Sequence, residues 1–173
     1  MRHLPLAALA LIFLAGCKEE VAELPDPVPL TEENVSFFCQ MNVLEHGGPK
    51  AQIHLEGFPI PLFFAQVRDA IAYLKSPERD ARILATYVSD MGAAPAWNLP
   101  GTQNWVNSGD AVFVIDAGVA GGMGAPEVVP FLLEEDALKF AGTYGGRLVS
   151  LADIPDGLVL GPVDPDLQLQ EPE

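Results

Sequence analysis

Hydrophobic and polar positions along the chain predict two successive units with the same order of elements. The first unit is expected to contain a strand, a short edge strand, a helix and another strand, at residues 51–57, 58–63, 64–75 and 81–90. The first strand is predicted from alternation, and the helix from Val67, Ile71 and Leu74 at helical spacing. The prolines of the second expected strand are compatible only with a short strand at a sheet edge, because proline has no N–H to donate to a neighbouring strand.

The second unit repeats this order. Its strands and helix are predicted at residues 111–118, 127–131, 133–144 and 147–154, with the helix third in order. A glycine-rich loop separates the first two strands. Gly145 and Gly146 end the helix, since glycine is favoured just past a helix C-terminus.

The two predicted helices align at an offset of 67 residues. The matched pairs are Phe64 with Phe131, Asp69 with Asp136, Ala70 with Ala137, and Ile71 with Leu138. One such unit is too small to bury a core comfortably by itself. The pattern therefore predicts an α+β fold of two similar ββαβ units packed together. Chance similarity between two amphipathic helices is the alternative.

Changes in composition divide the chain further. We expect a signal peptide at residues 1–16 and an acidic, proline-rich, lipid-anchored flexible tether at 17–34. The two units follow at 35–92 and 93–161, and a loose acidic tail at 162–173. The tether and the tail show no helical or alternating period, and their composition is typical of extended linkers.

The N-terminal pattern is that of a secretory signal. Arg2 and His3 precede an apolar run at residues 4–14, which is shorter than the about 20 residues needed to span a bilayer. The run closes with "LAGC", which resembles a bacterial lipobox and implies cleavage before Cys17 and lipid attachment to its sulfur. An ordinary signal peptide is the alternative. The expected location is the periplasmic side of a bacterial membrane, with inner and outer membrane both open because Lys18 is a weak sorting cue.

The net charge and the number of cysteines limit the partners of the chain and the roles of Cys39. A formal net charge of −15 argues against nucleic acid as a partner, because phosphates demand Lys and Arg. The sequence has two cysteines. With Cys17 committed to the anchor, Cys39 has no partner for an internal disulfide. It is then a reactive thiol, an intermolecular link, a metal ligand or a buried inert thiol.

Cys39 and Met41 are the first candidate metal ligands. Residues i and i+2 of a strand share a face, and in a turn the two sulfurs can also converge. Soft thiolate and thioether ligands select Cu(I), whereas zinc sites favour Cys, His and carboxylates. The pair therefore indicates Cu(I). The alternative is that Met41 fills a gap in the core and Cys39 is inert.

Other candidate ligands are few. His46 lies in a Gly–Pro turn, and Met123 lies in the glycine-rich loop, where close backbone approach can present its thioether to a site. The alternatives are an exposed histidine and a hydrophobic plug over the core. Met91 is a weaker candidate whose burial the preceding strand explains, and His54 is expected on a strand face.

Enzyme motifs are missing from the sequence. It contains no GxSxG, HExxH or CxxC, and the glycine-rich loop matches neither GxGxxG nor a Walker pattern. Cys39 and His46 can be imagined as nucleophile and base, but no oxyanion loop is evident nearby. The chain is therefore not expected to be an enzyme.

Several motifs together resemble the NosL family of copper-binding lipoproteins. They are the lipobox, "CQMNVLEHGGPKAQI" at 39–53, "YVSD" at 87–90, Trp105, "AVFV" at 111–114 and "GGMGAPEVVPF" at 121–131. Where the family usually has glycine between the cysteine and the methionine, this chain has Gln40. The resemblance implies a pair of ββαβ units and a membrane-tethered Cu(I) chaperone. It also implies delivery of copper to the catalytic copper–sulfur centre of nitrous oxide reductase, and docking to the membrane-bound assembly transporter of that system.

The leading hypothesis is thus a Cu(I) metallochaperone with Cys39 and Met41 at the core of its site. Met123 would add a sulfur ligand from the second unit, and His46 a nitrogen. The alternatives are a metal-free lipoprotein that docks a partner and a thiol enzyme that uses Cys39 and His46.

Overall fold

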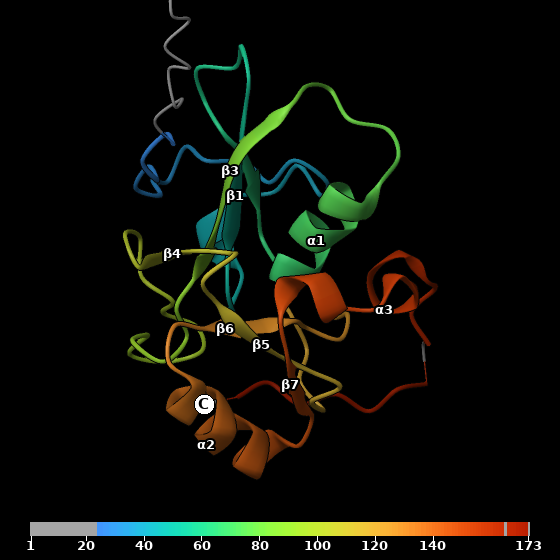
Figure 1. The fold of residues 1–173 in the computed structure, drawn as a ribbon. Coiled ribbons are helices and arrows are strands. Elements are labelled where there is room, and N and C mark those ends of the chain that lie inside the picture. Colours follow the sequence, from blue (N-terminus) through green and yellow to red (C-terminus); the bar gives the residue numbers. More distant parts are fainter. Residues whose placement is uncertain (1–23, 165, 173) are drawn as a thin grey trace, which may run out of the picture.

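The computed structural model describes residues 24–164 and 166–172, and it contains both predicted units in the predicted order (Figure 1). The first unit comprises β1 (Ala51–Leu55), β2 (Leu62–Phe64), α1 (Val67–Lys75) and β3 (Ile83–Ser89). The second comprises β5 (Val112–Ile115), β6 (Val129–Phe131), α2 (Glu134–Tyr144) and β7 (Arg147–Val149). Three short helices, η1 (Val43–Glu45), η2 (Leu151–Asp153) and α3 (Asp156–Leu160), and the strand β4 (Trp105–Asn107) complete the chain. The predicted α+β class is confirmed.

The two sheets share a three-stranded antiparallel arrangement. Their strand orders are β2-β1-β3-β4 and β6-β5-β7, so the first strand of each unit is central. Ala51 pairs with Phe64 in the first sheet, and Val112 pairs with Phe131 at the corresponding place in the second. The predicted equivalence of Phe64 and Phe131 is therefore seen in the register as well as in the sequence.

One strand crosses the expected boundary between the units. β4 pairs with β3, so residues 105–107 extend the first sheet although they lie beyond residue 92. The interpretation of residues 93–161 as the second unit thus holds only from β5 onward. A three-residue strand gives too short a pattern for alternation to reveal it.

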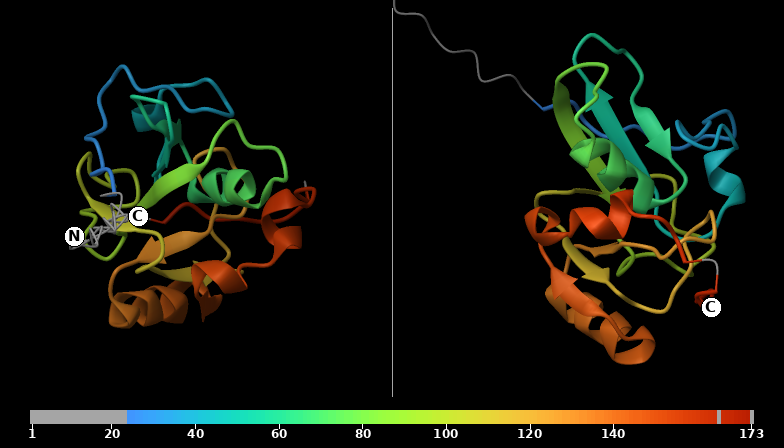
Figure 2. Two further views of the ribbon diagram at one scale, coloured as in Figure 1. Left: turned by 45° about the horizontal axis from the view of Figure 1, so that its top comes forward. Right: turned by 90° about the vertical axis from the view of Figure 1, so that its right-hand side faces the viewer.

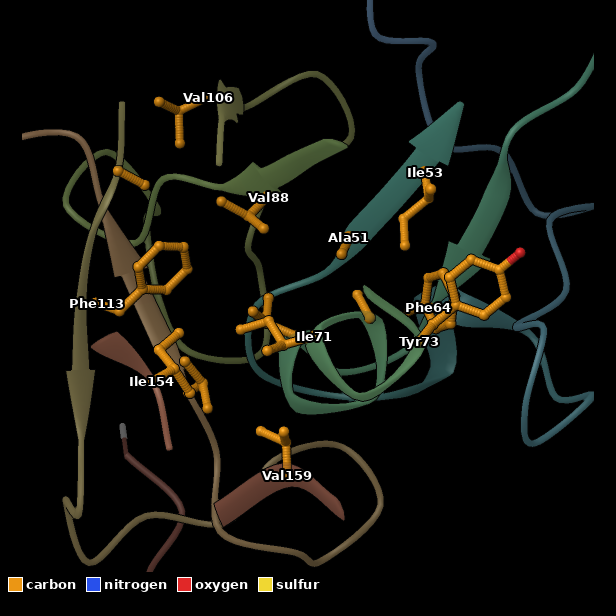
Figure 3. Packing of buried hydrophobic residues seen from close by; sticks show 14 of the residues in the cluster. Ala51, Ile53, Phe64, Ile71, Tyr73, Val88, Val106, Phe113, Ile154 and Val159 are labelled. Atoms are coloured by element: carbon orange, nitrogen blue, oxygen red, sulfur yellow. The ribbon is translucent and has the colours of Figure 1, made fainter. Parts of the chain in front are cut away.

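One hydrophobic cluster joins the two units. Figure 3 shows Ile71 of α1 among side chains from both sheets, including Val88 of β3 and Phe113 of β5. Ile154 and Val159 of the C-terminal helical turns pack into the same cluster. The expectation that two units bury a core together is confirmed. None of the helices among the described residues has the length and apolar character needed to cross a membrane.

The segment expected to be a flexible tether packs against the first sheet from Pro25 onward. Gln52 of β1 accepts a hydrogen bond from the Val28 amide and donates one to the Val28 carbonyl, both at 2.9 Å. The Tyr87 hydroxyl donates to the Pro25 carbonyl at 2.8 Å, and Leu30 is buried. A tether is therefore the wrong description for residues 25–34. The signal peptide and the lipidation site Cys17 lie outside the described residues.

The C-terminal segment is also held in place. The Gln170 amide donates to the Gly118 carbonyl, and its carbonyl accepts from the Ala120 amide, both at 2.9 Å. These bonds form a parallel bridge beside the glycine-rich loop. The segment expected to be a loose tail is thus fixed at Gln170. The sequence did not reveal this contact, because a single extended contact produces no periodic pattern. In the left view of Figure 2 the red C-terminal segment runs from α3 back across the molecule.

His54 lies on the face of β1 that the N-terminal segment covers. Its Nε2 atom is 2.9 Å from the Gln52 amide oxygen, and its ring packs edge-on against Tyr87. Burial lowers the pKa of His54. The prediction of a strand-face residue is confirmed, and the ring nitrogen already has a partner.

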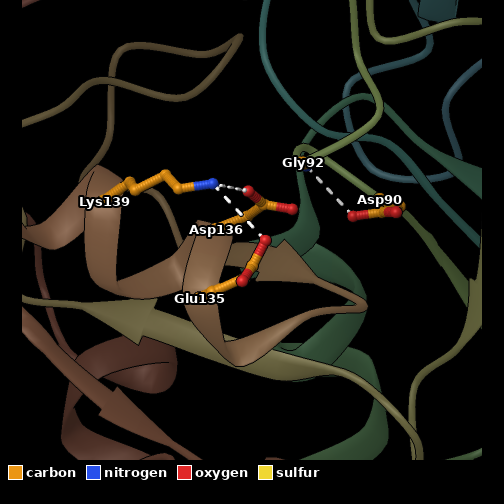
Figure 4. Close-up of polar contacts among 5 residues, drawn as sticks. All are labelled: Asp90, Gly92, Glu135, Asp136 and Lys139. Atoms are coloured by element: carbon orange, nitrogen blue, oxygen red, sulfur yellow. Dashed lines mark hydrogen bonds and ion pairs between the residues drawn. The ribbon is translucent and has the colours of Figure 1, made fainter.

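Asp90 connects the two units at the end of β3. Its carboxylate accepts hydrogen bonds from the Gly92 and Leu132 amides, both at 3.0 Å. Figure 4 shows this carboxylate near the first turn of α2, where Lys139 pairs with Asp136 at 2.9 Å and with Glu135 at 3.6 Å. The "YVSD" motif therefore ends in a residue that ties the first sheet to the second helix.

Candidate metal site

Cys39 and Met41 lie in a tight turn, not in a strand. The Ser36 amide donates to the Met41 carbonyl and the Gln40 amide to the Ser36 carbonyl, each at 2.9 Å. Between the two sulfur residues, Gln40 has a φ of 58°. This left-handed conformation costs a residue with a side chain roughly 1–2 kcal/mol relative to glycine.

The left-handed residue explains why glycine suits this position, and how glutamine is tolerated. The Gln40 side-chain amide donates to the Phe37 carbonyl at 2.7 Å and to the Ser36 carbonyl at 3.3 Å. These bonds hold the turn closed and offset part of the conformational cost. The departure from the family pattern therefore leaves the turn intact.

Aromatic packing anchors this turn to the core. The rings of Phe37 and Phe38 lie 6.1 Å and 5.5 Å from the ring of Phe64, both in edge-to-face arrangements. Cys39 itself is half-buried and has no disulfide partner among the described residues, while Met41 is 44% exposed. Met41 does not fill a gap in the core, so that alternative is wrong.

Met123 lies at the exposed tip of the glycine-rich loop. Its amide donates to the Gln66 side-chain oxygen at 3.2 Å, and its side chain is 41% exposed. A hydrophobic plug would be buried, so this alternative is also wrong. Gly121 and Gly122 bring the loop close to the first unit, because a Cβ on Gly122 would lie only 2.7 Å from the Cβ of His46.

His46 lies directly beneath this loop and is half-buried, which the expectation of an exposed histidine missed. Its Nε2 atom is buried and has no hydrogen-bond partner in the described part of the chain. An unsatisfied buried nitrogen costs roughly 1–3 kcal/mol unless something else binds it. His46 also lines a pocket of about 430 Å³ together with Trp97 and Gly121.

The three segments meet at Ala65 and Gln66, between β2 and α1. The Ala65 amide donates to the Ser36 hydroxyl of the Cys39 turn at 3.3 Å. Gln66 holds Met123, and Gly122 is close to the Ala65 carbonyl as well as to His46. The structure thus gathers the segments that carry all four predicted ligands around one short connection. Met91 lies elsewhere, packed against the core of the second unit.

Two buried charged residues at this junction were not predicted. Lys50 is fully buried, and its ammonium group donates to the Gly47 and Ala65 carbonyls, both at 2.9 Å. Glu127 is buried as well, and its Oε1 accepts from the Arg68 and Val128 amides at 2.9 Å, while its Oε2 has no hydrogen-bond partner among the described residues.

Burial moves the pKa values of both groups toward the neutral form. It lowers the pKa of Lys50 to about 8, against the opposing effect of the Glu127 and Cys39 charges. It raises the pKa of Glu127 to about 8, against the two backbone hydrogen bonds and the Lys50 charge. No sequence pattern marks the burial of either residue, because Lys50 and Glu127 both lie just outside the strands β1 and β6.

The candidate metal ligands near this junction are mostly sulfur atoms. The described residues contain no cluster of three or more His, Cys, Asp or Glu side chains that could hold a metal ion. Hard or borderline cations prefer such clusters. The donors near the junction are instead one thiol, two thioethers and one imidazole, which fit a soft cation such as Cu(I).

Trp97 fixes the turn that follows His46. A Cβ on Gly48 would lie 2.9 Å from the Trp97 ring, and Gly48 has a φ of 79°. The Gly48 amide donates to the Trp97 carbonyl at 2.7 Å. Both the left-handed backbone and the close indole therefore require glycine at this position.

This geometry agrees with the match of residues 27–159 to the NosL family. The chain belongs to the NosL family. It is 53% identical over 160 residues to the copper-binding lipoprotein NosL of Achromobacter cycloclastes. This match covers 92% of this chain and 83% of that protein. It is 29% identical over 157 residues to the copper-binding lipoprotein NosL of Stutzerimonas stutzeri, across 89% of this chain and 80% of that protein.

A solved NosL structure has the same fold. The crystal structure of the copper chaperone NosL from Shewanella denitrificans matches with a TM-score of 0.71 and 26% identity, over 76% of this chain and 97% of that chain. The family resemblance carried by the sequence motifs is thereby confirmed, as is the fold that it implied.

Proposed function

We propose that this chain is a Cu(I) metallochaperone that holds the ion through Cys39, Met41 and Met123, with His46 as a nitrogen ligand. The observation that carries the proposal is the meeting of the Cys39 turn and the Met123 loop at Ala65 and Gln66. The relatives named as copper-binding lipoproteins and as a copper chaperone support it.

The exposure of the thioethers suits a carrier better than a permanent metal site. Met41 and Met123 keep 44% and 41% of their surface exposed, so an incoming ligand can reach the ion. A thiolate supplies the one negative charge that balances Cu(I), and thioethers are neutral soft ligands. Exchange of a thioether for a ligand of the acceptor then transfers the ion without any change of its oxidation state.

The proposed destination is the catalytic copper–sulfur centre of nitrous oxide reductase, reached by docking to the membrane-bound assembly transporter. The proposed location is the periplasmic side of a bacterial membrane, with Cys17 carrying the lipid anchor. Incubating the Cu(I)-loaded chain with copper-free reductase and the transporter should restore copper to the reductase. No gain in copper over a control without the chain would contradict this destination.

We propose no enzymatic activity. No hydrogen bond joins Cys39 to His46 within the described residues, and the buried Nε2 of His46 contacts no hydrogen-bond donor or acceptor. A thiol enzyme needs a base within hydrogen-bond reach of its nucleophile. Rapid, pH-dependent alkylation of Cys39 in the copper-free protein would favour the thiol enzyme instead.

Competition titration with a chromophoric Cu(I) chelator tests the ligand assignment. Cys39→Ser should weaken Cu(I) binding about 100-fold or more, and Met123→Leu about tenfold, equivalent to roughly 2.8 and 1.4 kcal/mol. Met91→Leu is the matched control, because this methionine packs against the second-unit core and should leave the affinity unchanged. Unaltered binding in Cys39→Ser would overturn the site. Full function of Met41→Leu and Met123→Leu would favour a metal-free docking protein.

A further inference from the structure

Lys50 occupies the junction where the ligand-bearing segments meet. Its ammonium group donates to two backbone carbonyls, one next to His46 in sequence and the other next to Gln66, which holds Met123. A Cβ on Gly122 would lie 3.1 Å from each of these same two carbonyl oxygens. One buried cation therefore lies beneath the contact between the Met123 loop and the first unit.

The charge on Lys50 is only weakly balanced. The groups that face this cluster are Glu127 from the start of the β6 segment, Asp69 and Arg68 from α1, and Cys39 from its turn. No carboxylate of the described residues lies within ion-pair distance of the Lys50 ammonium group. Burial raises the pKa of Glu127 and so weakens its negative charge, while the two carbonyl oxygens at 2.9 Å from the Lys50 Nζ favour its charged ammonium form.

A fixed positive charge beside a cation site discriminates by valence. Its repulsion of a bound ion is proportional to the charge of that ion, so a divalent cation is repelled twice as strongly as Cu(I). The effect is larger where water is excluded, as it is around the fully buried Lys50. Affinity for divalent ions otherwise tends to be high, especially for Cu²⁺ and Zn²⁺.

We infer that Lys50 is a specificity-determining residue of the metal site, which disfavours Zn²⁺ and other divalent ions relative to Cu(I) while it positions the ligand-bearing segments. The inference rests on the proposed function, because it takes Cys39, Met41 and Met123 as the Cu(I) ligands. Lys50 itself binds no metal in this arrangement, since its ammonium group has no lone pair to offer.

The ratio of two dissociation constants tests the inference. Cu(I) and Zn²⁺ affinities are measured at pH 7 by competition with a chelator for each ion, in the unaltered chain, in Lys50→Gln and in Lys50→Arg. Glutamine is used because methionine would add a thioether. The Zn²⁺ to Cu(I) ratio of dissociation constants should fall at least tenfold in Lys50→Gln and stay within about threefold of the parent in Lys50→Arg, since arginine keeps the charge.

Loss of a purely structural contact would weaken both ions together and leave this ratio unchanged, so an unchanged ratio in Lys50→Gln overturns the inference. Glu127→Gln is the matched control, because it keeps the side-chain oxygen that accepts from Arg68 and should not move the ratio. Should Lys50→Gln fail to fold, Lys50→Leu removes the same charge with a side chain suited to burial. Failure of the unaltered chain to bind Cu(I) would instead contradict the proposed function.

Discussion

The two ββαβ units have the same topology but bury their helices to different extents. α1 buries five residues, Val67, Arg68, Ala70, Ile71 and Tyr73, because it lies between its own sheet and the elements of the second unit. α2 buries only Ala137 and lies at one end of the molecule (Figure 1). The equivalent residues Ile71 and Leu138 are 2% and 56% exposed. Equivalent helices of the two units thus differ in burial: α1 lies in the interior of the protein, and α2 lies at its surface.

The N-termini of the two helices are also stabilised differently. α1 lacks a side-chain cap of its own, and Glu127 of the second unit accepts from the Arg68 amide instead. α2 begins with Glu134, Glu135 and Asp136, which favour a helix N-terminus without help from elsewhere. The helix start that depends on the other unit is also the place where the Met123 loop docks. The proposed metal site therefore lies at the contact between the units and not within either one.

The comparison predicts its largest effect at the paired helix positions. Ile71→Ala should lower the free energy of unfolding by about 2–5 kcal/mol, because it leaves a cavity in the shared core. Leu138→Ala, at the equivalent place in α2, should change it by less than about 0.5 kcal/mol. Urea denaturation measures both. Equal losses in the two variants would show that the exposure of Leu138 does not describe the folded protein.

The second prediction concerns Glu127, whose raised pKa links stability to pH. Between about pH 5 and pH 8 the folded chain keeps a proton on Glu127 that the unfolded chain has lost, so the free energy of unfolding should fall as pH rises. The parent should lose about 1–3 kcal/mol across this window relative to Glu127→Gln. Thermal or urea unfolding at several pH values gives the difference between the two proteins, in which groups that do not interact with Glu127 cancel. Parallel curves for the two proteins would contradict a buried neutral carboxyl.

The smallest effect is expected where the C-terminal segment meets the second unit. Gln170→Pro removes the amide that donates to Gly118, and it should cost about 1 kcal/mol. Gln168→Pro is the control, because the Gln168 amide donates to no backbone carbonyl in the described part of the chain. Differential scanning calorimetry on the full chain would resolve the two. An effect of Gln168→Pro as large as that of Gln170→Pro would point to a general effect of proline in this segment.

The sequence was most informative where contacts are local. Alternation and helical spacing gave the order of the strands and helices of both units, and His54 was correctly expected on a strand face. Their bounds were less accurate: β2 covers Leu62–Phe64 where residues 58–63 were expected, and part of the last expected strand forms η2. The Cys–Met spacing also identified Cys39 and Met41 as neighbours, although as residues of either a strand or a turn. The left-handed Gln40 decides for the turn, and its conformation is stabilised by hydrogen bonds that a residue pattern does not contain.

Long-range contacts were the features that the sequence did not reveal. Pro25 and Val28 were assigned to a tether because proline-rich acidic segments are usually solvated, yet Tyr87 and Gln52 of the first sheet hydrogen-bond to them. Lys50 was missed for a related reason, since lysine is almost never buried unless it is paired. Its two carbonyl partners become neighbours only after β2 folds back beside β1.

The indole of Trp97 gives the proposed metal site an optical reporter. Trp97 and Trp105 are the two tryptophans of the sequence, and only Trp97 lines the pocket next to His46. Trp105 packs instead beside Leu30 and Val43. Trp105→Phe would therefore leave a single fluorophore whose emission responds to changes at the turn of Gly47 and Gly48. Loading and release of a metal ion near His46 should then be visible in real time from intrinsic fluorescence, without any added label.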